Sequence, residues 1–304
     1  MRKQAAFLCI LVAGAAASFY AIGANGSRVV VRNESATPFS GARAYSHVEE
    51  LVSLGPRSIG SDSIVKARRY ISGYLSSLGL EVWIDAFSAT YKGTTYRMEN
   101  IIGVIPGKTG RIIAVGGHYD TKEIPGANDG GSSSGLLLEL SRVLASTALN
   151  HTVWIVFFDG EDVGDDLATM FFGSRHLAEK LGADEQKPEW LIVADMIGDR
   201  HLGIRKDRNS DQDLVEYVWR KAKDLGYGRH FKLSQIAVMD DHVPFMAIGV
   251  PSCLLIDFRY GPLNSYWHTA KDDLDKIDAR SLKALGDVIF RVIEGLDSGE
   301  LGPT

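Results

Sequence analysis

The chain has 304 residues, of which 45% are hydrophobic and 23% are charged, a composition typical of a globular protein with one or two domains. Its formal net charge is −5, and no cluster of lysine and arginine residues stands out, which argues against a nucleic-acid partner. The sequence contains no internal repeat and no low-complexity tract.

The N-terminus is typical of an export signal. Arg2 and Lys3 give a positive start, and an apolar stretch and a run of small residues follow, as they do before a cleavage site. The apolar character of residues 5–24 is also nearly long enough for an uncleaved membrane anchor. We therefore expect residues 1–24 to be a signal peptide or an N-terminal anchor. The protein is then exported, to the periplasm or the medium, and meets a membrane only through this segment.

A polar linker is expected at 25–40, and a single domain at 41–304. Helical periodicity and capping residues predict helices at 41–54, 62–79, about 134–148, about 169–182 and about 281–296. Strands are predicted at 81–89, 95–107, 111–120, 152–160, 190–198 and 251–258.

The strands from residue 111 onward are unbroken apolar runs that alternate with helices. Such runs are typical of strands buried on both faces, as in a parallel sheet covered by helices. The sequence therefore predicts an α/β fold with a mostly parallel central sheet and helices on both faces.

Acidic side chains and histidines occur where these strands end. They are His118, Asp120, Asp129, Glu161, Asp162, Asp195, Asp241 and His268. Polar residues at the carboxyl ends of strands converge on one crevice of an open α/β sheet. Unpaired, so many acids would repel one another, and a divalent cation is the simplest way to hold them together.

Each of these signals also has a purely structural explanation. Asp129 lies among glycines and serines ahead of an apolar helix, where it would serve as an N-cap. Glu161 and Asp162 would form a solvated acidic loop, and His118 would bond its neighbour. Against this, two adjacent acids permit one to bind a metal while the other moves protons.

Seven short motifs, taken in order, resemble the zinc aminopeptidase superfamily. They are GGHYD (116–120), GANDGGSSSG (126–135), FFDGED (157–162), GSRHLA (173–178), ADMIGD (194–199), DDHVPF (240–245) and YWHT (266–269). Within that superfamily, the chain most resembles the glutaminyl cyclases. Four features carry this resemblance: DGE, GSRHLA, the double aspartate before His242, and Trp267 directly before His268. The resemblance runs from about Leu51 to Ile293 and implies a zinc-aminopeptidase-like fold, a phosphorylase/hydrolase-type sandwich.

The resemblance implies that Asp129, Asp162 and His268 hold a single zinc ion. Glu161 would be the general acid/base, and Trp267 would form one wall of the glutamine pocket. The family's acid pair usually ends in Glu, so the shorter arm of Asp162 would need a small backbone shift. The following loop, 163–171, is shorter than in animal cyclases and lacks their tryptophan, so one wall of the pocket must differ.

The same resemblance gives Asp195 and Asp241 the role of acidic hydrogen-bonding partners of Glu161. His118 and Asp195 are also the residues that would bind a second zinc in the di-zinc aminopeptidases. The expected activity is zinc-assisted conversion of the N-terminal Gln of peptides or proteins to pyroglutamate, with release of ammonia. The alternative is an exported zinc aminopeptidase with two zinc ions.

Overall fold

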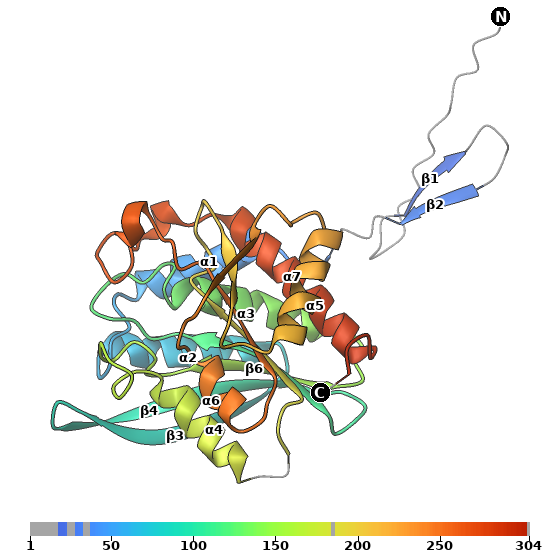
Figure 1. Ribbon diagram of the computed structural model, residues 1–304. Helices are drawn as coiled ribbons and strands as arrows, with labels where there is room; N and C mark the ends of the chain where they lie inside the picture. Colours follow the sequence, from blue (N-terminus) through green and yellow to red (C-terminus); the bar gives the residue numbers. More distant parts are fainter. Residues whose placement is uncertain (1–17, 23–27, 33–36, 184–185, 303–304) are drawn as a thin grey trace, which may run out of the picture. The chain divides into compact units, whose positions relative to one another are not determined.

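The structure is a computed structural model that describes residues 18–22, 28–32, 37–183 and 186–302 (Figure 1). The chain divides into two units, Met1–Pro38 and Phe39–Thr304. In the first unit, β1 (Ser18–Ile22) pairs antiparallel with β2 (Arg28–Arg32). The rest of the expected signal or anchor, and part of the expected linker, lie outside the described residues. Within the described part of the chain, no helix has the length and apolar character needed to cross a membrane.

Six strands of the second unit form one sheet, in the order β10-β7-β5-β6-β4-β3. They are β3 (Glu81–Tyr91), β4 (Thr94–Ile105), β5 (Ile112–His118), β6 (Thr152–Phe158), β7 (Trp190–Asp195) and β10 (Ser252–Ile256). The neighbours β10, β7, β5 and β6 are parallel, whereas β4 and β3 form an antiparallel hairpin at one side. This sheet confirms the predicted fold class.

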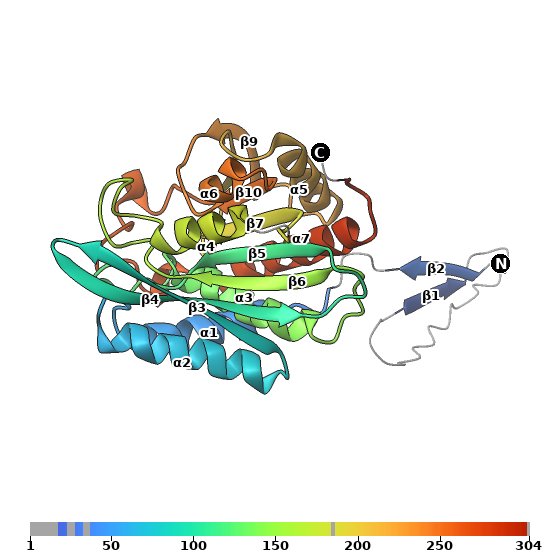
Figure 2. The same cartoon turned by 90° about the horizontal axis from the view of Figure 1, so that it is seen from below.

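Helices cover both faces of the sheet (Figures 1 and 2). One face carries α1 (Gly41–Ser53), α2 (Asp62–Ser77), α3 (Gly131–Leu144), α5 (Gln212–Asp224) and α7 (Ala279–Asp297). The other carries α4 (Phe172–Gly182) and α6 (His242–Ala247). Successive strand residues serve opposite cores: in β7, Ile192 packs with the first set of helices and Val193 with the second.

Two predicted helices begin at different residues in the structure. Helix α3 starts three residues earlier than expected. It begins directly after Gly130, whose φ of 74° lies outside the helical region. Helix α4 starts three residues later, because Phe171 has a φ of 58°, outside the helical region.

Several elements of the second unit were not predicted from the sequence, and neither were β1 and β2 of the first. Those of the second unit are α5, α6, the parallel pair β8 (Ile204–Asp207) and β9 (Phe231–Ile236), and 3-10 turns at Pro262–Asn264 and Leu274–Lys276. The signal for α5 is present, since Asp211 caps it and Leu214, Val218 and Ala222 line its buried face. Most residues of β9 are exposed, so it has no apolar alternation to reveal it.

Helices α1 and α3 pack closely at Gly135. A Cβ atom at this position would lie 2.5 Å from the carbonyl oxygen of Ala44 and 2.6 Å from Cγ2 of Val48. The carbonyl oxygen belongs to the backbone of α1 and cannot move aside as the end of a flexible side chain can. The close packing of α3 against α1 therefore requires that residue 135 has no side chain. This contact fixes the helix that follows Asp129.

We predict that Gly135→Ala lowers the free energy of unfolding by about 1–3 kcal/mol, because the added methyl overpacks the interface. Gly73→Ala is the matched control, since Gly73 lies in helix α2 with no atom within 4 Å of its missing Cβ. That control is expected to stabilise the protein by about 0.5–1 kcal/mol. Urea unfolding of both variants checks the prediction, and a Gly135→Ala variant as stable as the wild type would contradict it.

Candidate metal centre and active site

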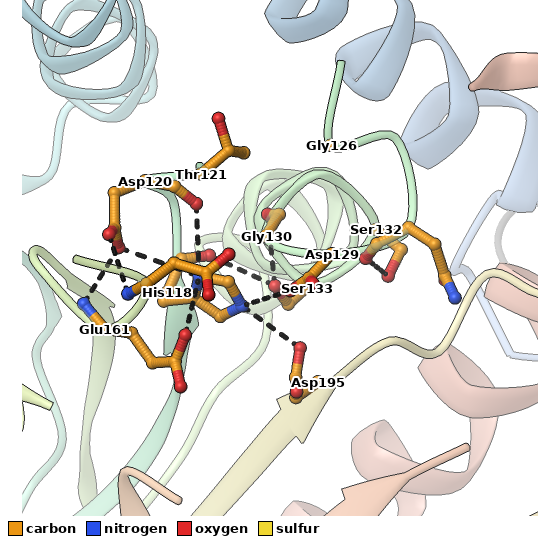
Figure 3. Close-up of polar contacts among 12 residues, drawn as sticks. His118, Asp120, Thr121, Gly126, Asp129, Gly130, Ser132, Ser133, Glu161 and Asp195 are labelled. Carbon is orange, nitrogen blue, oxygen red and sulfur yellow. Dashed lines mark hydrogen bonds and ion pairs between the residues drawn. The ribbon is translucent and has the colours of Figure 1, made fainter. Parts of the chain in front are cut away.

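The carboxyl ends of the parallel strands bring the polar residues together at one edge of the sheet. His118 is the last residue of β5 and Asp195 is the last of β7. Glu161 and Asp162 follow β6, and Asp129 precedes α3. Their side chains point toward one another from four different segments (Figure 3 labels all of them except Asp162). The predicted convergence of these residues is therefore observed.

Asp129 stands at the centre and is shared by two groups of side chains. The first contains Asp129, Asp162 and His268, and the second contains His118, Asp129 and Asp195. In each group the candidate ligand atoms lie within 4.8 Å of one another. Asp129 turns one oxygen toward each group: Oδ2 is 3.4 Å from Nε2 of His268, and Oδ1 is 3.2 Å from Nε2 of His118.

His268 enters the site from the loop after β10, with its backbone in the left-handed region at φ 54°. Its Nε2 lies 2.9 Å from Oδ1 of Asp162. The Trp267 ring stacks on the imidazole with 3.9 Å between centroids, and Phe258 makes an edge contact with Trp267, with 5.0 Å between centroids. The aromatic pair therefore fixes the orientation of the imidazole and leaves Trp267 half-buried beside it.

The first group has the properties of a metal site. Asp129 Oδ2 and both carboxylate oxygens of Asp162 are buried, yet no hydrogen bond reaches them. The short contact of Asp162 with His268 does not meet hydrogen-bond geometry. Buried carboxylate oxygens without a partner are costly, and a cation satisfies them. Two carboxylates and one imidazole also form a donor set that zinc accepts.

The second group is already satisfied by hydrogen bonds. His118 Nδ1 lies 3.1 Å from the backbone oxygen of Asp120, to which it must donate. Its Nε2 lies 3.1 Å from Asp195 Oδ1. Burial opposes a charged imidazole, but Glu161 and the other surrounding carboxylates raise the pKa of His118 well above its ordinary value. Both ring nitrogens of His118 therefore have hydrogen-bond partners within the second group or next to it.

Asp120 has a role that its sequence position did not reveal. Its two carboxylate oxygens accept hydrogen bonds from the backbone N–H groups of Glu161, at 3.1 Å, and Asp162, at 2.9 Å (Figure 3 shows the first residue pair). One side chain thus fixes both peptide groups of the acid pair. The sequence suggested only a bond to its neighbour His118, because contacts across 41 residues leave no local pattern.

The site is rich in buried acidic residues. Seven buried acids line it, namely Asp120, Asp129, Glu161, Asp162, Asp195, Asp240 and Asp241. Burial, together with the charges of Asp162 and Asp240, raises the pKa of Glu161 well above its usual value, although His118 opposes the shift. A carboxyl with a raised pKa exchanges its proton nearer neutral pH, as general acid/base catalysis requires.

Asp241 acts on Glu161 through its charge, whereas Asp195 lies on the other side of their shared neighbour His118 in the chain of contacts. Within the described residues, neither hydrogen-bonds to the Glu161 carboxyl. Asp195 contacts His118, and the oxygens of Asp241 have no hydrogen-bond partner. Burial raises the pKa of Asp241 to about 7, with Asp195 and Asp120 adding to the shift.

Comparison with known proteins agrees with this geometry. Residues 100–293 match peptidase family M28. Aminopeptidase YwaD of Bacillus subtilis is 29% identical over 272 residues, which are 84% of this chain and 57% of YwaD. The chain therefore spans less than two thirds of that relative.

Solved structures resemble the whole domain. A glutaminyl cyclase from an Acidobacteriales bacterium is 33% identical, with a TM-score of 0.83 over 90% of this chain and 99% of that one. The glutaminyl cyclase of Porphyromonas gingivalis is 31% identical, with a TM-score of 0.81 over 86% of this chain and 100% of that one. The family match covers more than half of the sequence, so the chain belongs to peptidase family M28 and shares its fold with these glutaminyl cyclases.

Proposed function

We propose that this chain is a zinc-dependent glutaminyl-peptide cyclotransferase. It converts the N-terminal Gln of peptides or proteins to pyroglutamate and releases ammonia. One observation carries the proposal: in a chain 33% identical to a glutaminyl cyclase, unsatisfied oxygens of Asp129 and Asp162 meet His268 directly beside Glu161. The enzyme's partners are peptide N-termini, which suits the export expected from residues 1–24.

In this proposal Asp129, Asp162 and His268 would hold one zinc ion and leave a position open for substrate. When bound, zinc supplies a Lewis acid that polarises the side-chain carbonyl of the N-terminal Gln and stabilises the negative charge developing on its oxygen. The shorter arm of Asp162 does not prevent this, because its oxygen already lies 2.9 Å from His268 Nε2. Trp267, stacked beside that imidazole, would wall the pocket for the Gln side chain.

Glu161 would move the proton. The α-amino nitrogen of the substrate attacks the γ-carbon, a new C–N bond closes the ring, and the bond to the amide nitrogen breaks. Glu161 accepts a proton from the attacking amine and delivers it to the departing nitrogen, which leaves as ammonia. Both reacting groups belong to one residue, so holding them in the curled conformation contributes much of the acceleration. Asp195 and Asp241 would keep Glu161 basic enough to accept the proton.

An aminopeptidase is the second candidate. It is favoured by the group His118, Asp129 and Asp195, which would hold a second metal, and by the similarity to YwaD. Glu161 would then activate a water molecule. The hydrogen bonds already made by both ring nitrogens of His118 favour one metal, and hence the cyclase.

Two substrates distinguish the candidates. We expect purified protein with zinc to release ammonia from a peptide that begins with Gln and to leave leucine p-nitroanilide intact, because the site activates the substrate's own amine. Ammonia release and nitroaniline absorbance are followed separately. Rapid nitroaniline release without cyclisation would contradict the cyclase proposal and support an aminopeptidase instead.

Glu161→Gln tests the proton transfer. The variant keeps the shape of the side chain but cannot accept a proton, so kcat for cyclisation should fall by about 10²–10⁴-fold. Zinc content, measured by atomic emission, should stay equal to that of the wild type. Glu139→Gln is the matched control, because Glu139 is buried in α3 but pairs with Arg142 away from the site. Near-normal turnover in Glu161→Gln would show that Glu161 is not the group that transfers the proton.

A further inference from the structure

The loop that carries Asp129 lies between two buried charges from distant parts of the chain. Arg57 belongs to the connection between α1 and α2, and Asp272 follows the loop that carries His268. Both side chains are fully buried. Neither residue was singled out in the sequence, where Asp272 belongs to a charged run that would ordinarily face solvent.

Arg57 binds the carbonyl groups of this loop. Its guanidinium donates from Nη1 to the oxygen of Pro125 at 3.1 Å and from Nη2 to that of Gly126 at 2.8 Å. Nε donates to the oxygen of Tyr119 at 2.8 Å, on the segment that links His118 to Asp120. Within the described residues, no carboxylate forms an ion pair with this guanidinium. A buried cation is costly without such a partner, so these carbonyl contacts alone do not account for its presence.

Asp272 binds the amide groups of the same loop. Its Oδ1 accepts from the backbone N–H of Asn128 at 2.8 Å, and its Oδ2 accepts from that of Asp129 itself at 3.0 Å. The hydroxyl of Tyr260 donates to Oδ1 at 2.7 Å. The carboxylate therefore fixes the peptide group of the residue that both candidate metal groups share.

The two contacts complement each other along the loop. The cation takes the carbonyls of residues 125 and 126, and the anion takes the amides of residues 128 and 129. Burial lowers the pKa of Arg57 to about 10, and Asp272 opposes this shift more than any other nearby carboxylate. A glycine suits position 126, since its φ is 61° and a Cβ there would lie 2.2 Å from Cγ2 of Thr121, 2.9 Å from the oxygen of Asp129 and 3.0 Å from Nη2 of Arg57.

We infer that Arg57 and Asp272 form a pair of positioning residues that act across the Asp129 loop and hold Asp129 ready for the metal. The inference rests on the proposed metal site. A loop fixed before the ion arrives loses little conformational freedom on binding, so the pair should act on metal affinity as well as on stability. Both side chains are fully buried, so we expect the pair to act through the loop and not on the substrate.

The test uses zinc alone as the ligand. Arg57→Lys keeps the positive charge but removes the several N–H donors of the guanidinium. Asp272→Asn keeps the shape of the side chain but removes its negative charge. The dissociation constant for zinc is measured by competition with a chelator at fixed pH, and melting temperatures are measured with and without zinc. Each variant is expected to bind zinc at least tenfold more weakly. The double variant should lose less than the product of the two single losses, because the two residues hold the same loop.

Asp85→Asn is the matched control. Asp85 is also a buried carboxylate, which accepts from Asn100 and Lys180 outside the site. This variant should lower the melting temperature without changing zinc affinity. If Asp272→Asn does not fold, Tyr260→Phe carries the same test, because it removes only the hydroxyl that bonds Asp272.

Two results would overturn the inference and are distinguishable. If wild-type protein binds zinc but Arg57→Lys and Asp272→Asn bind it within twofold of the wild type, the pair is merely structural. If wild-type protein binds no zinc, the proposed metal site fails together with the inference. Cyclase activity is not the readout, so an error in the proposed reaction would leave the result intact.

Discussion

Repulsion among buried carboxylates is the constraint on which this site depends. Seven acids lie at one edge of the sheet, almost without access to solvent. Backbone amides offset part of the charge, as where Asp120 accepts from both residues of the acid pair. The His118 imidazole, which lies 3.1 Å from Asp195 Oδ1, offsets another part. The oxygens of Asp129 and Asp162 that accept no hydrogen bond are the ones that face His268, and this is where we propose that a cation binds.

The fold concentrates the acids at this edge. Four parallel strands end there, so short connections after β5, β6 and β7 deliver side chains from segments far apart in the chain. Positive φ angles occur at Gly130 after β5, at Gly160 after β6 and at His268 after β10. The same framework serves cyclases and aminopeptidases. In this chain, the oxygens of Asp162 accept no hydrogen bond, whereas both ring nitrogens of His118 have partners.

Much of this architecture was predictable from the sequence, because its causes are local. Unbroken apolar strands reveal a parallel sheet, and polar residues at their ends reveal the crevice. The contacts that hold the site are not local: Arg57 bonds carbonyls 68 and 69 residues away, and Asp272 bonds amides 143 and 144 residues away. The sequence does not indicate which side chain will bind a given backbone amide or carbonyl group. The roles of Asp120, Arg57 and Asp272 can therefore be recognised only in the three-dimensional structure.

The central claim is that a divalent cation joins Asp129, Asp162 and His268. Crystals of the protein purified with zinc, measured on both sides of the zinc absorption edge, test it most directly. The account predicts one strong anomalous peak between the carboxylates of Asp129 and Asp162 and Nε2 of His268, with no second peak beside His118 and Asp195. Absence of a peak among those three residues, in crystals that contain zinc, would contradict it.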